Sequence, residues 1–165
     1  MIWFMLFMSV FYISGFGMLA YALWSVKKST AAAAWPTTPG IVKNAEIKSS
    51  SDSDGDTTYE VKVAYSYKIG GQEYTGDRLA YGYTASSGQE AHQEILNKLK
   101  AAKAIDVRYD PTDFAASTLS YGIHRSIQFV LAFAVTWLLF TCGFSLIWWI
   151  ASRNDSVLLN NLSVR

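Results

Sequence analysis

Two long runs without a charged residue constrain this chain most strongly. Residues 2–26 and residues 126–152 contain no Asp, Glu, Lys, Arg or His, and 20 side chains in each run are hydrophobic. A helix needs roughly 20 apolar residues to cross a bilayer core about 30 Å thick. Because backbone groups in hydrocarbon must be satisfied within the segment, both runs are predicted to be transmembrane helices.

Aromatic and charged residues flank both runs, as is typical of spans whose ends lie in the head-group region. We expect eight of these residues to lie at the membrane interface: Trp3, Trp24, Lys27, Lys28, His124, Arg125, Trp148 and Trp149. The absence of ionisable residues inside the runs argues against a pump or channel that works alone.

The apolar runs have two other interpretations. One is a buried helical hairpin in a soluble protein, which the length of both uncharged runs disfavours. The other is a signal peptide at residues 2–26, followed by a small-residue stretch at 31–34. The first run has no basic residue before it and its apolar part is too long for a signal peptide, so a retained span is favoured.

Two spans would place both chain ends on one side of the membrane and the middle of the chain on the other. Lys27, Lys28 and Arg125 flank the middle segment, whereas Arg153 and Arg165 lie on the terminal side. Since basic residues favour the cytoplasm, this count leans toward a cytoplasmic middle domain. We expect the residues from 153 to 165 to form a polar tail.

Between the runs, residues 27–34 are expected to form a linker or a helix end, and residues 35–121 a β-rich domain. Residues 27–125 hold 12 basic and 12 acidic side chains, so no net charge draws the chain to nucleic acid. A strand is predicted over residues 40–48, followed by a polar hairpin loop at 49–56. The acidic residues of that loop lack the glycine and glutamate positions of a calcium-binding loop.

The strongest strand signal is an alternation over residues 59–69. Tyr59, Val61, Val63, Tyr65, Tyr67 and Ile69 share one face, opposite a mostly polar one. That period of two is typical of a half-buried strand. Gly70-Gly71 then predicts a tight hairpin to a strand that starts at Gln72.

A helix is expected to follow, started by a capping box from Ser87 to Glu90 and ending near Lys103. Its predicted buried face is Ala91, Ile95, Leu99 and Ala102. Strands are then predicted over residues 105–109 and 117–121. The middle domain is therefore expected to be α+β, with a mainly antiparallel sheet or open barrel and one amphipathic helix.

Three sequence blocks in the middle domain resemble a known family. They are WPTTPGIV at residues 35–42, VAYSYKIGGQEYTGDR at 63–78 and IDVRYDPTDFAASTL at 105–119. This chain resembles the bacterial membrane-protein family called domain of unknown function 3592. The resemblance implies a small β-rich domain beside membrane helices, in a bacterial inner (plasma) membrane. It implies no catalytic residue.

No motif for catalysis, phosphate binding or metal binding was found, and no cofactor is expected. A surface for a partner is the remaining candidate site; its expected members are Tyr74, Tyr81, Tyr83, Asp106, Arg108 and Asp110. The favoured function is a non-enzymatic, membrane-anchored module that binds another membrane protein, or a second copy of itself. The alternatives are a membrane-surface enzyme or maturation factor, and a lipid-sensing or envelope-stress element.

Overall fold

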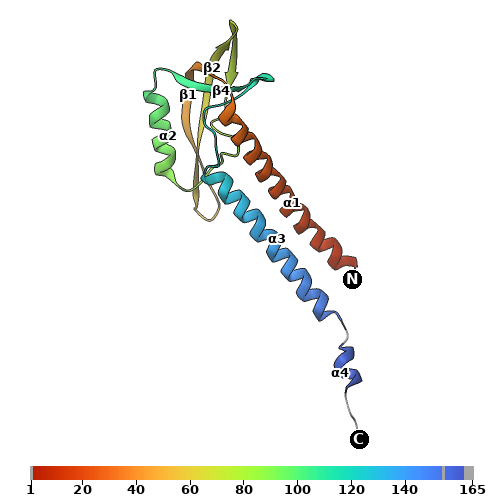
Figure 1. Cartoon of the computed structure of the whole chain (residues 1–165). Coiled ribbons are helices and arrows are strands. Elements are labelled where there is room, and N and C mark those ends of the chain that lie inside the picture. Colours follow the sequence, from red (N-terminus) through yellow and green to blue (C-terminus); the bar gives the residue numbers. More distant parts are fainter. Residues whose placement is uncertain (1, 154, 162–165) are drawn as a thin grey trace. The chain divides into compact units, whose positions relative to one another are not determined.

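A computed structural model of the chain describes residues 2–153 and 155–161 (Figure 1). Arg165, which entered the charge count above, lies outside the described residues. The chain forms two compact units. The terminal unit holds Met1–Ala20 and Leu131–Arg165. The inner unit, so named for its place in the sequence, holds Tyr21–Val130.

The inner unit is built on a five-stranded antiparallel sheet with the order β3-β2-β1-β4-β5. The strands are β1 (Thr37–Ser51), β2 (Thr57–Ile69), β3 (Gln72–Gly76), β4 (Ile105–Asp110) and β5 (Asp113–Thr118). Helix α2 (Gln89–Ala101) lies beside β1 and β2, as Figure 1 shows. The predicted fold class, two long apolar helices flanking a small α+β domain, is confirmed.

Strand β2 has the alternating faces that its sequence predicts. Val61, Val63, Tyr65 and Tyr67 are buried on one face and form the centre of the core. The turn to β3 has φ of 59° and 88° at Gly70 and Gly71. Positive φ at both turn residues explains why the sequence places two glycines there.

Strand β1 is longer than the predicted residues 40–48. Its first residues, Thr37–Gly40, pair with β4, whereas Gly40 and the residues after it pair with β2. Its last residues, Ser49–Ser51, pair with Thr57–Tyr59. These long-range pairings extend the strand past its local β signal. The loop is correspondingly shorter, with turn hydrogen bonds between Asp52 and Asp56 and between Gly55 and Asp52.

The capping box predicted for α2 is wrong. The helix begins after Gly88, and no side chain caps its first turn. Ser87 stands one residue before that cap position, so its hydroxyl is not the helix cap.

The predicted buried face of α2 is also shifted. His92, Leu96 and Leu99 are buried, whereas Ala91 is exposed. The physical reason is that the His92 side chain has hydrogen-bond partners inside the domain, described below. An apparently polar position therefore replaces Ala91 on the core face.

Strand β5 was predicted at residues 117–121 but spans Asp113–Thr118. A tight turn starts it early, because the Asp110 carboxylate accepts hydrogen bonds from the backbone and hydroxyl of Thr112. Phe114 then packs edge-on against the rings of Tyr74 and Tyr109.

Helices α1 (Ile2–Ala31) and α3 (Arg125–Ala151) are the two predicted apolar helices. The stretch expected as a linker or helix end, residues 27–34, is helical: α1 continues to Ala31, and a short 3-10 helix, η1 (Ala32–Ala34), follows. Both long helices are long and apolar enough to cross a membrane, and only 11% of their most apolar windows is buried. Within the expected polar tail, α4 (Ser156–Asn160) exposes three aliphatic residues, Val157, Leu158 and Leu159.

In the terminal unit, α1 and α3 contact each other in an antiparallel sense. The ring of Phe4 stacks on Trp148 at 4.3 Å, and the ring of Phe11 stacks on Trp137 at 5.7 Å. Trp137 Nε1 also donates a 3.0 Å hydrogen bond to the Phe11 carbonyl. Aromatic packing therefore supplies much of the contact between these two helix segments.

Candidate functional site

Arg108, expected on a partner surface, lies against the end of the helical segment that precedes the sheet. Its Nη1 donates to the carbonyls of Ala33 and Trp35 at 3.0 and 3.1 Å, and to that of Ala32 at 3.4 Å. The guanidinium also lies 4.2 Å from the ring centre of Tyr121. A cation at a helix C-terminus satisfies carbonyls that have no helical partner, so Arg108 acts as a structural clamp.

Asp110 completes this clamp from the same strand. Its carboxylate lies 3.7 Å from Lys28 Nζ, in α1. The hydrogen bonds from Thr112 lower the pKa of Asp110, with a smaller contribution from Lys28. Asp106, the third charged residue expected on the partner surface, is exposed and stands opposite Pro39 in the sheet.

Tyr81 is buried rather than exposed to a partner. Its ring packs edge-on against Trp24 at 5.7 Å and against Trp35 at 5.9 Å. The Arg78 guanidinium lies 4.4 Å from the centre of the Tyr81 ring. His124 lies at hydrogen-bond distance from the Tyr81 carbonyl, with Nε2 2.8 Å from it. This cluster joins α1, the 78–83 segment and the start of α3.

Tyr74 and Tyr83 also have contacts within the domain. The ring of Tyr74 stacks on that of Tyr67 at 5.8 Å. Tyr83 Oη accepts a hydrogen bond from the Val61 backbone at 3.0 Å and lies 2.6 Å from His92 Nδ1. Burial raises the pKa of Tyr83. The six predicted surface residues therefore do not form one patch; only Tyr81 and Tyr83 share the polar pocket described below.

Ser86, His92 and Tyr83 form a chain of hydrogen bonds that resembles a catalytic relay. Ser86 Oγ lies 2.8 Å from His92 Nε2, and burial lowers the pKa of His92. Tyr83 Oη also accepts a hydrogen bond from the Val61 backbone N–H. The directions of the two hydrogen bonds at His92 follow from the tautomer of its ring. The chain joins α2 to the segment after β3 and to β2.

A polar pocket of about 240 Å³ opens beside this cluster. Its charged lining consists of Glu60 and Lys62 from β2 and of Asp77 and Arg78 after β3. Its remaining lining comes from Val61 and from two aromatic-rich segments, Tyr21 with Trp24 in α1 and residues 79–83. None of these four charged residues was predicted to belong to a site. Asp77 and Arg78 are adjacent in the sequence. Only the tertiary fold places them beside the pocket residues of β2 and α1.

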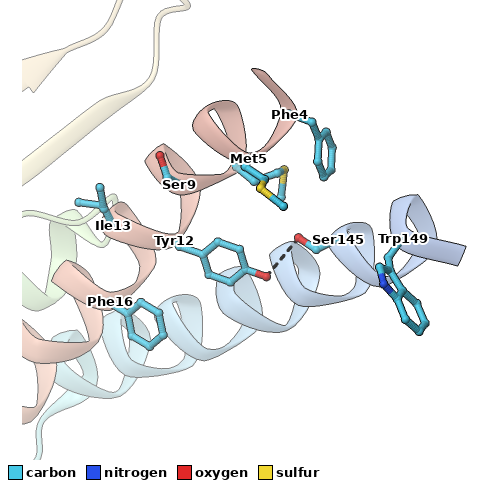
Figure 2. Close-up of a pocket in the computed structure, with 9 residues that line it drawn as sticks. Phe4, Met5, Ser9, Tyr12, Ile13, Phe16, Ser145 and Trp149 are labelled. Atoms are coloured by element: carbon cyan, nitrogen blue, oxygen red, sulfur yellow. Dashed lines mark hydrogen bonds between the residues drawn. The ribbon is translucent and has the colours of Figure 1, made fainter. Parts of the chain in front are cut away.

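An apolar groove of about 690 Å³ lies between α1 and α3 in the terminal unit (Figure 2). Its hydroxyl groups satisfy one another or the backbone: Tyr12 Oη donates to Ser145 Oγ at 3.1 Å, and Ser145 Oγ donates to the Thr141 carbonyl at 2.9 Å. Ser9 Oγ donates to the Leu6 carbonyl. The remaining lining residues are aromatic, aliphatic or methionine side chains. The groove is therefore suited to apolar groups.

Six of the eight residues expected at the membrane interface are exposed: Lys27, Arg125, Trp3, Trp24, Trp148 and Trp149. Five of the eight also make contacts within their own unit. Trp24, Lys28 and His124 have the partners given above, Trp148 stacks on Phe4, and Trp149 lies 3.6 Å beneath the Arg153 guanidinium.

Within the described part of the chain, no group of three or more His, Cys, Asp and Glu side chains is arranged to hold a metal ion. Cys142 is the one cysteine of the chain and is a free, exposed thiol.

Comparison with known proteins identifies the inner unit. Neither a curated protein nor a solved structure matches the chain significantly. One family model, described as a domain of unknown function (DUF3592), matches residues 38–124. That match begins in β1, ends just before α3 and covers more than half of the chain. The chain belongs to the DUF3592 family.

Proposed function

We propose that this chain is an integral membrane protein and that its DUF3592 domain is a non-catalytic binding module held at the membrane surface. The observation that carries the proposal is the apolar surface of the two long helices. Side chains such as Ile13, Phe140 and Leu139 are 68–71% exposed. Exposed apolar surface on this scale marks a membrane or protein contact.

Polar contacts hold the domain to the helical segments that belong to its own unit. Arg108 and Asp110 join β4 to the end of α1, and Ser29 Oγ donates a 2.8 Å hydrogen bond to the Gly122 carbonyl before α3. The domain is thereby attached to the ends of both helices within its own unit.

The non-catalytic part of the proposal rests on how the reactive groups are used. Both ring nitrogens of His92 lie at hydrogen-bond distance from side chains of the domain, and Arg108 and Asp110 make contacts within the fold. A Ser86→Ala variant tests the enzyme alternative, because it removes the candidate serine nucleophile, and its melting temperature reports any effect on the fold. A phenotype abolished by Ser86→Ala, with unchanged thermal stability, would favour the enzyme.

Membrane integration is tested by extraction of cell membranes with alkaline carbonate. An integral protein stays in the pellet and is released only by detergent. Release into the carbonate supernatant would contradict the proposal. The intact mass of the pelleted chain separates a retained first span from a cleaved signal peptide, since cleavage near residues 31–34 removes all of the apolar run.

The partner is proposed to be another membrane protein or a second copy of the chain. Affinity purification from nanodiscs, followed by mass spectrometry, tests both. Recovery of a membrane protein or of a cross-linked dimer supports the module. Recovery of the chain alone, as a monomer, in several mild detergents contradicts this part of the proposal.

A further inference from the structure

The polar pocket of the inner unit has the chemistry of a lipid head-group site. We propose that it binds a phosphate ester that carries a primary ammonium group, the phosphoethanolamine class, with phosphatidylethanolamine as its membrane form. That the ligand comes from a membrane lipid rests on the membrane placement proposed above. That the pocket recognises phosphoethanolamine does not depend on that placement.

Two of the four charged residues in the pocket are free to bind a ligand. Glu60 and Lys62 neutralise each other, with Lys62 Nζ 2.8 Å from Glu60 Oε1. Neither Asp77 nor Arg78 makes a side-chain hydrogen bond or ion pair with another described residue. The pocket therefore offers one free carboxylate and one free guanidinium, which complements a zwitterion.

The Arg78 guanidinium is already positioned. Its central carbon lies 4.4 Å from the centre of the Tyr81 ring, and Tyr81 is itself buried against Trp24 and Trp35. Stacking on a fixed ring restricts the guanidinium but leaves its N–H groups available. A planar N–H fork of this kind recognises phosphate oxygens well.

Asp77 selects the ammonium part of the ligand. It is exposed, so its carboxylate is accessible from solvent. A primary ammonium has three N–H donors for this carboxylate, whereas a quaternary ammonium has none. An anionic head group without an ammonium would bring only like charge toward Asp77. The pocket is thus expected to prefer ethanolamine over choline or glycerol head groups.

The aromatic wall of the pocket places it at the end of an apolar helix run. Tyr21 and Trp24 line the pocket from α1, and Lys27 follows within one turn. Tyrosine and tryptophan favour the boundary between hydrocarbon and head groups. The volume of about 240 Å³ lies below the roughly 300–1,000 Å³ of drug-sized ligand sites, so a head group fits the scale.

Native mass spectrometry of the full chain in detergent tests the preference. Separate titrations use phosphatidylethanolamine, phosphatidylcholine and phosphatidylglycerol with matched acyl chains. We expect the ethanolamine lipid to bind about tenfold more tightly than the other two, the effect of about one charge-assisted hydrogen bond. Equal binding of the three lipids would overturn the proposal.

Variants assign the preference to the pocket. Asp77→Asn should abolish the preference for the ethanolamine lipid. The matched control is Asp106→Asn, which changes an exposed carboxylate on β4. Arg78→Gln should weaken binding of all three lipids by about tenfold, with exposed Lys100→Gln as its control. Because Arg78→Gln also removes the contact with Tyr81 and could loosen the fold, Asp77→Asn is the decisive variant. A preference that survives Asp77→Asn overturns the assignment.

Soluble phosphoethanolamine separates the two sources of this chemistry. If the soluble compound displaces the lipid, the pocket binds a free phosphate ester. If the chain selects the ethanolamine lipid but the soluble compound does not displace it, the ligand of the pocket is the membrane lipid. Failure of both contradicts the pocket, whereas release of the chain by carbonate contradicts membrane placement alone.

Discussion

Replacing Arg108 by methionine removes the guanidinium that joins β4 to the end of the helical segment. The substitution keeps most of the aliphatic side chain. It leaves the carbonyl of Trp35, which belongs to a buried residue, without the hydrogen bond from Nη1 at 3.1 Å. It also removes the contact with the Tyr121 ring at 4.2 Å.

The cost can be estimated from these contacts. Hydrogen bonds to a charged group contribute about 1.5–3 kcal/mol, and the partial exposure of Arg108 favours the low end. A cation–π contact at an exposed site adds about 0.5–1 kcal/mol. We therefore expect Arg108→Met to lower the free energy of unfolding by about 2–3 kcal/mol. For a unit of this size that corresponds to a melting temperature roughly 8–12 °C lower.

Thermal unfolding of the full chain in one detergent, followed by tryptophan fluorescence, provides the measurement. Arg108→Lys retains the positive charge near the helix end but not the planar group over Tyr121, so an intermediate loss is expected. Asp106→Ala, on the same strand and exposed, is the control and should change the melting temperature little. If Arg108→Met melts within about 2 °C of the wild type, the interpretation of Arg108 as a clamp is incorrect.

Three further perturbations test the inner unit by the same assay. Gly82→Ala should lower stability by about 1–3 kcal/mol, because φ is 71° and a Cβ would lie 2.9 Å from Ser25 Cβ; Gly55→Ala, with φ of 87° and open space around it, should cost less. Burial lowers the pKa of His92, so neutral His92 stabilises the fold fully above about pH 6.5, and that contribution should be lost progressively as pH falls below it; a wild type and His92→Gln with equal pH slopes would argue against this. Tyr65→Phe should cost about 1–2 kcal/mol, since the hydroxyl makes two hydrogen bonds of 3.1 Å, and no loss would show that these bonds do not stabilise the unit.

The sequence was informative where local pattern and packing agree. The alternation from residue 59 to residue 69 predicts β2 and its buried face, and Gly70-Gly71 predicts the turn. The two uncharged runs predict α1 and α3 within a few residues. In each case the signal is a period or a length that the backbone geometry imposes.

Long-range contacts explain most of the errors. His92 is polar, but Tyr83 and Ser86 satisfy its ring nitrogens, which turns α2 by one position. Arg108 was expected on a partner surface, but the carbonyls that accept its hydrogen bonds lie more than 70 residues earlier in the chain. Local patterns do not report such pairs.

The pocket could not be predicted for the same reason. Asp77 and Arg78 are neighbours in sequence, whereas Trp24 lies far earlier in the chain. Trp24 lines the same pocket and packs edge-on against Tyr81. Each of these residues has an ordinary interpretation on its own: a surface pair, an interfacial tryptophan and a tyrosine of a partner surface. Their combination in one pocket follows from the tertiary fold.

The central claim is that α1 and α3, which flank the DUF3592 domain in the sequence, both span a membrane, and two-sided cysteine labelling tests it most directly. Ile2→Cys at the start of α1, Ser53→Cys in the exposed loop after β1 and Ser156→Cys in α4 are each introduced into a Cys142→Ala background. Sealed and opened cells or vesicles are then treated with a membrane-impermeant maleimide. Two spans predict that positions 2 and 156 are labelled from one side of the membrane and position 53 from the other. Labelling of position 53 from the same side as either of the other two, or recovery of the labelled chain in the soluble fraction, would contradict that claim.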